Sequence, residues 1–232
     1  MEFSKKYLLI FISFLILNNI HLNAANNNLN DQYTVLPKSV QDNYLVKEQI
    51  EQDCNKSQIL EFFSYSCPAC HKIEPVISKL KERINGNQSI VIKQLPVVFH
   101  NSWQDTAKLY FAIDKFNLQN KLHAYIFDTI QNNGSNNLEN LNIKSILDGY
   151  NNKNPNNKVN TDDILKVFNS NIITRDVKNT MRLFYAFNLN STPVFIVNGK
   201  YLISVQSQTT PEDMLNTIIK LAKQDKITCS KN

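Results

Sequence analysis

The sequence predicts an α/β protein in which a block of helices is inserted into a sheet. Three observations lead to this prediction. A strand, a helix and a second strand are expected over residues 59–95, a mainly helical stretch covers 102–187, and strand character returns from Val194 before a final helix. An apolar fraction of 42% in 232 residues is enough for a core, and nothing is left for a second independent one once the N-terminus is set aside.

The first 24 residues have the pattern of an export signal. Lys5 and Lys6 form a positive region, Tyr7 to Ile20 is almost wholly apolar, and Ala24 and Ala25 provide small residues for cleavage. The competing interpretation is an uncleaved anchor, but the apolar run is short for a membrane span, which needs ~20 residues. We therefore expect residues 1–24 to be a signal peptide that is removed.

The charge of the chain excludes one class of partner. The net charge is +5, and the Lys and Arg residues are scattered rather than gathered in a dense run. This distribution does not indicate a nucleic-acid-binding protein.

The sheet is expected to begin with a weak strand and a strong one. Tyr33 to Leu36 is compatible with a short edge strand that Pro37 ends, whereas the polar stretch 38–56 has no clear pattern. Residues 59–65 form an apolar, aromatic-rich run, which is typical of a buried strand.

A helix is expected to follow the buried strand directly. Pro68 suits the first helical turn, and apolar residues then recur at helical spacing as far as Ile84, with Pro75 expected to kink the helix. Ile90 to Leu95 alternates and is rich in Ile and Val, so it is expected to form the next strand. The two strands should be parallel, with a right-handed crossover between them.

The middle of the chain is expected to be helical. Apolar residues indicate one helix around Trp103 to Phe116, a second around Leu122 to Ile130 and a short segment at Ile143 to Leu147. Thr161 is expected to cap the next helix at its N-terminus, and a last long helix contains Val177 to Tyr185.

The end of the chain returns to the sheet. Val194 to Val197 and Tyr201 to Val205 flank Asn198-Gly199, which is the strongest short-range signal for a hairpin. Thr210-Pro211-Glu212-Asp213 then has the cap, the proline and the acidic residues of a helix start.

The chemistry is predicted to lie at Cys67-Pro68-Ala69-Cys70. A redox dithiol needs one accessible sulfur that is a thiolate at neutral pH and a second sulfur close to it. Cys67 falls at a helix N-terminus, where unpaired N–H groups and the helix dipole stabilise a thiolate. Such a position lowers a Cys pKa from about 8.5 into the range ~3.5–7.5. Cys70 lies one turn later and suits the resolving role.

Other interpretations of the motif remain open at this stage. Together with His71 it has the pattern for covalent attachment of a c-type haem, as in an exported electron carrier. A structural short-loop disulfide and a zinc site are further alternatives, although no second ligand pair has metal spacing. The preceding strand, Pro75 and Thr192-Pro193 favour the redox dithiol and no metal. On that view His71 is a solvent-side helix residue.

Three segments carry a family resemblance. They are residues 61–70, then Leu95-Pro96-Val97 with Trp103 and Ala107, and residues 191–201. With these segments the chain resembles the DsbA-like branch of the thioredoxin superfamily over nearly all of its mature part. The resemblance implies a thioredoxin-like fold, formed by residues 25–101 and 188–232, with an inserted α-helical domain at 102–187.

The resemblance also implies an activity. It implies a periplasmic enzyme, without a cofactor, that uses Cys67 and Cys70 to introduce disulfides into exported proteins. A membrane quinone-linked partner similar to DsbB would reoxidise the pair. Pro193 should be cis, and the backbone of Thr192 should pair with an extended substrate. Glu61, inside an apolar strand, is the expected proton relay; the alternative is that it only meets a polar partner.

Two departures from the family pattern bear on the direction of the reaction. Ala69 stands where strongly oxidising members often have His, which removes one source of thiolate stabilisation, and Pro75 is more similar to thioredoxin itself. A disulfide isomerase or reductase of the same fold is therefore the alternative activity.

A second cysteine pair is expected at the other end of the sheet. In this fold Cys54 precedes the motif strand and Cys229 follows the final helix, so both should lie away from the active site. A structural disulfide between Cys54 and Cys229 is allowed by this arrangement; the alternative is two free thiols.

Overall fold

The computed structural model describes residues 32–132, 141–225 and 227. The expected signal peptide, residues 1–24, lies outside these ranges, and so does Cys229. Within the described ranges no helix is both long and apolar enough to cross a membrane.

Within the described residues, five strands form one sheet in the order β1-β5-β4-β2-β3. The central strand β2 (Ser57–Phe63) is parallel to β3 (Ile90–Pro96) and antiparallel to β4 (Val194–Val197). The sheet continues through β5 (Tyr201–Ser204) to the short edge strand β1 (Thr34–Val35). The parallel pair, the hairpin and the edge strand predicted from the sequence are all confirmed.

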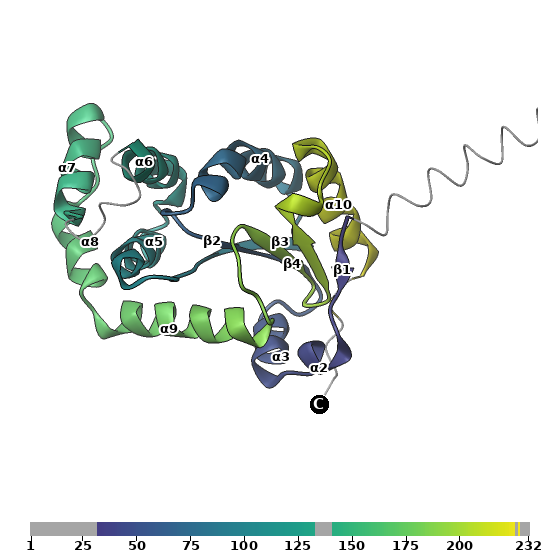
Figure 1. Ribbon diagram of the computed structural model, residues 1–232. Coiled ribbons are helices and arrows are strands. Elements are labelled where there is room, and N and C mark those ends of the chain that lie inside the picture. Colours follow the sequence, from purple (N-terminus) through teal and green to yellow (C-terminus); the bar gives the residue numbers. More distant parts are fainter. Residues whose placement is uncertain (1–31, 133–140, 226, 228–232) are drawn as a thin grey trace, which may run out of the picture.

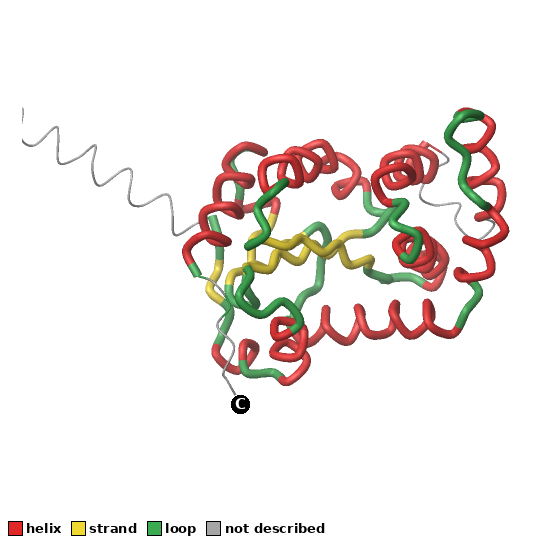
Figure 2. Tube along the Cα trace, turned by 180° about the vertical axis from the view of Figure 1, so that it is seen from behind, coloured by secondary structure: helices red, strands yellow, loops and turns green. Residues whose placement is uncertain are grey.

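Helices cover both faces of the sheet, as Figures 1 and 2 show. One face carries α4 (Pro68–Ile84) and α10 (Pro211–Gln224), and the other carries α3 (Tyr44–Glu51) and α9 (Asn171–Ala186). Ile59 packs in the core below α4 and α10, whereas Leu60 and Phe62 pack in the core below α9. Successive side chains of β2 alternate between the faces, so Glu61 points to the α4 side.

The inserted helices form a lobe beside the sheet (Figure 1). A 3-10 turn (Asn101–Trp103) leads into α5 (Gln104–Asp114), followed by α6 (Gln119–Asn132), α7 (Ile143–Lys153) and α8 (Thr161–Phe168). Helix α9 then leads back to β4. The lobe has its own apolar core, which also includes Phe63, Tyr65, Cys67 and Cys70. The cysteine motif therefore lies where the sheet meets the helical lobe.

Three local expectations were incomplete or wrong. The stretch 38–56, which had no clear pattern, forms α2 (Lys38–Gln41) and α3, with the Asn43 side chain accepting from the Leu45 N–H. Helix α7 runs to Lys153 instead of ending near Leu147. Asn160, not Thr161, caps α8: its side chain accepts from the Asp163 N–H, while the Thr161 hydroxyl donates to Asp148 at 3.1 Å.

The hairpin turn explains the Asn198-Gly199 pair. Both residues have positive φ angles, 53° for Asn198 and 63° for Gly199. A Cβ atom at Gly199 would also lie 1.7 Å from Cδ1 of Ile50. The turn packs directly on α3, so only glycine fits this position.

Candidate active site

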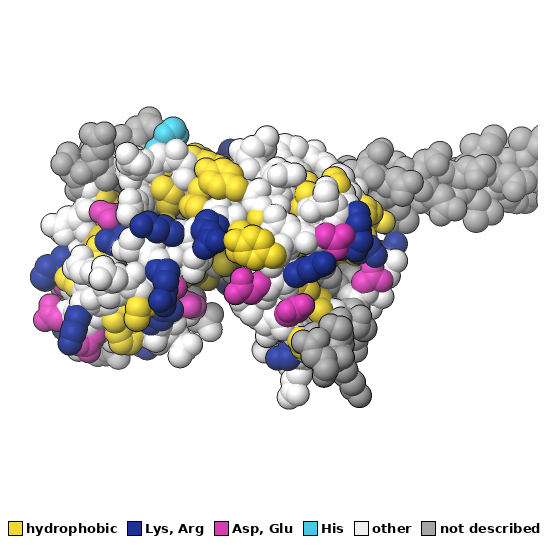
Figure 3. Space-filling view, turned by 90° about the horizontal axis from the view of Figure 1, so that it is seen from below, with side chains coloured by type: hydrophobic (Ala, Val, Ile, Leu, Met, Phe, Trp, Pro, Cys, Tyr) yellow, Lys and Arg dark blue, Asp and Glu magenta, His cyan; other side chains and the backbone are white. Residues whose placement is uncertain are grey.

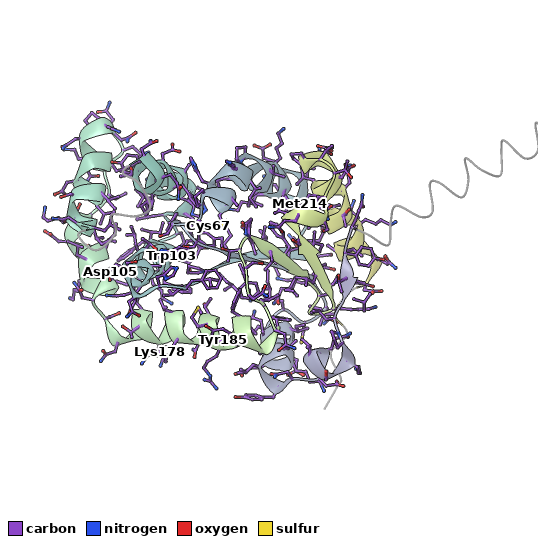
Figure 4. The ribbon with its side chains drawn as sticks, in the orientation of Figure 1. Cys67, Trp103, Asp105, Lys178, Tyr185 and Met214 are labelled. Carbon is purple, nitrogen blue, oxygen red and sulfur yellow. The ribbon has the colours of Figure 1, made fainter. Side chains whose placement is uncertain are left out.

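The turn between β2 and α4 positions Cys67. The Ser64 carbonyl accepts from the Cys67 N–H at 3.1 Å, and the Ser64 hydroxyl accepts from the Ser66 N–H at 3.1 Å. Cys67 becomes the N-cap of α4, and its sulfur accepts from the Cys70 N–H at 3.3 Å. Cys67 thus lies at the start of α4, facing the lobe of inserted helices (Figure 4).

The environment of Cys67 favours a thiolate. Its pKa is lowered to about 6, first by the hydrogen bond with the Cys70 side chain and then by Thr192 and by the N–H groups of Cys70 and Ala69. Partial burial acts in the opposite direction but does not prevail. The residue is less open than the sequence suggested, because only 8% of it is exposed.

Cys70 has the opposite environment. Only 1% of the residue is exposed. Burial is the largest cause that raises its pKa far above the usual range, and the hydrogen bond with Cys67 and the nearby charges of Cys67 and Glu61 act in the same direction. The two sulfurs are both free thiols here, and they differ sharply in their tendency to ionise.

The loop before β4 brings Thr192 and Pro193 to the cysteines. The peptide bond between them is cis, and Pro193 is buried. The Cys67 thiol donates to the Thr192 carbonyl oxygen at 3.6 Å. The backbone that the family resemblance assigns to substrate pairing therefore lies directly beside the Cys67 sulfur.

Glu61 is 1% exposed and lies behind the cysteines on the α4 side of the sheet. Gln94 is its partner in the parallel register of β2 and β3, and the Gln94 amide donates to Glu61 Oε2 at 2.8 Å. Burial, followed by the charge of Glu74, raises the pKa of Glu61 to about 8. Glu61 therefore has a polar partner and is also poised to hold a proton at neutral pH.

Glu61 belongs to a larger group of polar side chains that we call the rear cluster. Its members are Glu61, Tyr65, Glu74, Lys81, Gln94 and His123. Sequence reasoning identified only Glu61. The sequence does contain a signal for His123. This residue lies next to Leu122 on the face of a helix whose other buried residues are apolar, so a buried histidine could have been predicted there.

His71 was expected to be a solvent-side residue, and its side chain is indeed 36% exposed, but it also contacts α6. Its Nε2 lies 2.7 Å from Asp128 Oδ1, and its ring stacks on Phe127 with the ring centres 5.7 Å apart. His71 is half-buried against α6 because the inserted lobe covers this side of α4.

The second cysteine pair is only partly within the described residues. Cys54 lies in the turn before β2, whereas Cys229 lies outside the described ranges, so their pairing stays a prediction. Two hydrogen bonds bear on it: the Asn55 N–H donates to the Ile227 carbonyl at 3.1 Å, and the Ile227 N–H donates to the Lys56 carbonyl at 3.3 Å.

Comparison with known families identifies the family of the chain. A family model described as thioredoxin matches residues 54–220, well over half of the chain. The chain belongs to the thioredoxin family. This match does not support the alternative of haem attachment.

Relatives place this thioredoxin-family chain in the DsbA-like branch. Thiol:disulfide interchange protein DsbA of Pseudomonas syringae pv. tomato is 26% identical over 171 residues, covering 74% of this chain and 76% of the relative. The DsbA of Bordetella pertussis is 27% identical over 149 residues, covering 64% and 66%.

Solved structures agree at the level of the fold. The crystal structure of Pseudomonas aeruginosa DsbA matches with a TM-score of 0.66 and 21% identity, over 83% of this chain and 91% of that one. The oxidoreductase NmDsbA1 of Neisseria meningitidis matches with a TM-score of 0.62 and 24% identity, over 83% and 91%. The protein is a DsbA-like thiol:disulfide oxidoreductase with an inserted helical block.

Proposed function

We propose that the protein is an exported oxidase that transfers the disulfide of Cys67 and Cys70 to reduced client proteins in the periplasm. The proposal rests on the opposite shifts of the two cysteine pKa values: the pKa is lowered for Cys67 and raised for Cys70. Cys67 has its pKa lowered to about 6, and a sulfur that is stable as a thiolate is a good leaving group. Stabilisation of the reduced form in this way favours transfer of the disulfide to other proteins.

The reaction runs in two exchange steps. A client thiolate attacks Cys67 of the oxidised pair, a client–Cys67 disulfide forms, and the Cys67–Cys70 bond breaks with its electron pair on Cys70. Cys70 takes up a proton, since its buried thiolate is strongly disfavoured. A second client thiolate then attacks the client sulfur, the client disulfide forms, and Cys67 leaves as the thiolate.

The loop at Thr192 and Pro193 supports a role in client binding. The carbonyl of Thr192 lies beside the Cys67 sulfur. An extended segment of a client can pair with this backbone as an added strand, which fixes the client sulfur near Cys67 without requiring a particular sequence.

The cycle requires an electron acceptor. Each turnover leaves Cys67 and Cys70 reduced, and a membrane quinone-linked partner similar to DsbB would reoxidise them. This partner and the periplasmic location come from the resemblance and from the export signal at residues 1–24.

Equilibration of the purified protein with glutathione buffers tests the direction of the reaction. We expect a reduction potential clearly less negative than the value of about −270 mV that is typical of thioredoxin. A value at or below that level would contradict the oxidase proposal. Rapid refolding of scrambled ribonuclease, without net oxidation of reduced ribonuclease, would instead support the isomerase alternative.

A further inference from the structure

One side of α6 lies against the active-site segment. Gln131 donates from its side chain to the Tyr65 carbonyl at 2.6 Å, Phe127 packs on Tyr65, and Nδ1 of His123 lies 2.7 Å from the Tyr65 hydroxyl. These residues are four apart and share one face of the helix. Only 4% of His123 is exposed, and it is the ionisable member of this face.

The orientation of the Gln94 amide is fixed by its neighbours. Lys81 Nζ lies 2.7 Å from Gln94 Oε1, and an ammonium group has donors only. The oxygen of the amide therefore faces Lys81. Its NH₂ group faces Glu61 Oε2 at 2.8 Å and His123 Nε2 at 3.2 Å.

Nε2 of His123 meets two groups with opposite requirements. The Gln94 NH₂ group is a donor and needs Nε2 without a proton. Glu74 Oε2, 3.3 Å away, is an acceptor and needs Nε2 with a proton. The two hydrogen bonds exclude each other, while the Tyr65 hydroxyl can serve Nδ1 in either state because it both donates and accepts.

We propose that His123 is a positioning residue for the exchange reaction: by gaining or losing the proton on Nε2, it turns from Gln94 to Glu74 and thereby sets the protonation of Glu61 behind Cys70. This inference rests on the proposed oxidase function. On this proposal His123, a residue of the helical insert, takes part in the reaction together with Glu61 and Cys70.

The proton balance shows why such a residue matters. In the proposed step the proton that Cys70 takes up as it leaves comes from Glu61, which lies near enough to influence the pKa of Cys70, and a buried carboxylate remains close to Glu74. Lys81 already provides one positive charge near Glu61, but two buried carboxylates are stabilised further by a second positive charge beside Glu74. A proton on His123 supplies that charge, pairs with Glu74 and frees Gln94 to bond fully with Glu61.

A surface groove borders this cluster. A groove of about 560 Å³ at the open edge of β3 is lined by Lys81, Gln94 and Tyr110, among others. Figure 3, seen from the α9 side, shows a hollow between two lobes of the surface. Lys81 and Gln94 are the members of the rear cluster that line the groove, and Gln94 connects it to Glu61 and His123.

The groups that face His123 come from every element packed around it. They are Glu74 on α4, Tyr65 in the turn before α4, Tyr110 on α5 and, through Gln94 on β3, both Glu61 on β2 and Lys81 on α4. Among these, Glu74 is the acceptor for the proton on Nε2 of His123. The influence of His123 on the protonation of Glu61 must therefore depend on Glu74.

The test is the rate of reduction of the oxidised protein by dithiothreitol as a function of pH, divided by the concentration of dithiothreitol thiolate. In the wild type this rate should fall as Glu61 loses its proton near pH 8. In H123Q, which retains hydrogen-bonding groups but no titrating proton, the midpoint should move up by about half a pH unit or more.

Two further variants locate the effect. E61Q should abolish the fall in the reduction rate near pH 8, which would show that Glu61 is the group that titrates. E74Q should lower the midpoint, and adding H123Q to E74Q should then change it little, because the charge that His123 offsets is gone. His100 is an exposed histidine in the loop after β3, and H100Q is the matched control with the wild-type midpoint.

A second measurement needs no variant. In the wild type labelled with ¹⁵N-histidine, the Nε2 resonance of His123 should differ between the oxidised and the reduced protein. Identical resonances, or an H123Q profile that superimposes on the wild type, would overturn the inference. Failure of the wild type to oxidise a reduced peptide would instead remove the proposed oxidase function itself.

Discussion

At the scale of single residues, the difference between Cys67 and Cys70 arises from one helical turn. Cys67 caps α4 and meets N–H groups, whereas Cys70 lies inside the first turn and meets apolar side chains of the helical lobe. The same backbone geometry therefore provides a thiolate at one sulfur and a thiol at the other.

Ala69 offers a direct test of the electrostatics at Cys67. In A69H a cationic imidazole beside the motif should lower the pKa of Cys67 further, by roughly half a unit to one unit, and make the reduction potential less negative. Thiolate absorbance near 240 nm as a function of pH gives the pKa. A69Q is the matched neutral control, and an equal shift in both variants would show that charge is not the cause.

Glu61 should make the stability of the protein depend on pH. Its pKa is raised from 4.5 to about 8 in the folded state. The unfolded chain therefore loses this proton at lower pH than the folded one, so stability is fully present below about pH 4.5 and falls as the pH rises to about 8. The fall should amount to a few kcal/mol, since one pKa unit corresponds to about 1.4 kcal/mol.

Urea unfolding of the oxidised protein at several pH values measures this effect. E61Q should lack the fall, because glutamine mimics the protonated acid at every pH. Glu212 is exposed and pairs with Arg83 on the surface, so E212Q should retain the wild-type pH dependence. If E61Q and the wild type lost stability in parallel between pH 5 and pH 8.5, Glu61 would not be the group responsible.

At the scale of elements, helix α6 is held against the active-site segment mainly by packing. Phe127 is fully buried and contacts the rings of Phe63, Tyr65, His71 and His123. The pair of His71 and Asp128 is much more exposed. Surface pairs contribute little to stability, whereas a lost aromatic ring leaves a cavity.

Two variants on α6 should therefore behave very differently. F127A should lower the free energy of unfolding by about 3–5 kcal/mol, and D128N by less than about 1 kcal/mol. Chemical unfolding at neutral pH separates these values. Comparable losses in the two variants would show that the ion pair, rather than the packing, holds α6 to α4.

The success of the sequence predictions varied with the range of the interactions involved. The dithiol turn, the hairpin and the parallel pair follow from local patterns, such as Pro68 at a helix start and Asn198-Gly199 between strands. Helix α3 was missed because half of its eight residues are polar and only Val46 is fully buried. The rear cluster was missed because it joins residues from β2, β3, α4 and α6. The spacing of residues in the sequence does not predict contacts between elements so far apart in the chain.

The capping error at α8 has a similar cause. Both Asn160 and Thr161 are able to cap a helix, and their side chains differ little in that preference. The choice is made by Asp148 on α7, which accepts from the Thr161 hydroxyl and draws this residue into the helix. A contact between two helices thus decides where the second one begins.

At the scale of the whole molecule, Ile227, which follows the last helix, lies beside the start of β2. Ile227 forms hydrogen bonds with Asn55 and Lys56, which follow Cys54 directly, and Cys229 comes two residues after Ile227. This proximity supports the predicted disulfide between Cys54 and Cys229, at the end of the sheet away from Cys67.

The predicted disulfide can be tested by its effect on stability. C229S should lower the free energy of unfolding by about 2–4 kcal/mol, since a cross-link over a long loop restricts the unfolded chain. Mass spectrometry of the thiol-blocked, non-reduced protein should show residues 54 and 229 unmodified in one linked peptide. An alkylated Cys229 in the native protein would contradict the pairing.

The position of the insert in the chain has a consequence for how the protein is made. Strand β2 pairs with β3 soon after both are synthesised, but its other partner, β4, follows only after the whole helical block. On the proposed export route the N-terminal part would emerge first, so Cys54, Cys67 and Cys70 would enter an oxidising compartment before Thr192 and Pro193 arrive to cover the motif. Until then the chain itself would be a reduced client, and Cys54 could form a non-native disulfide with Cys67 or Cys70.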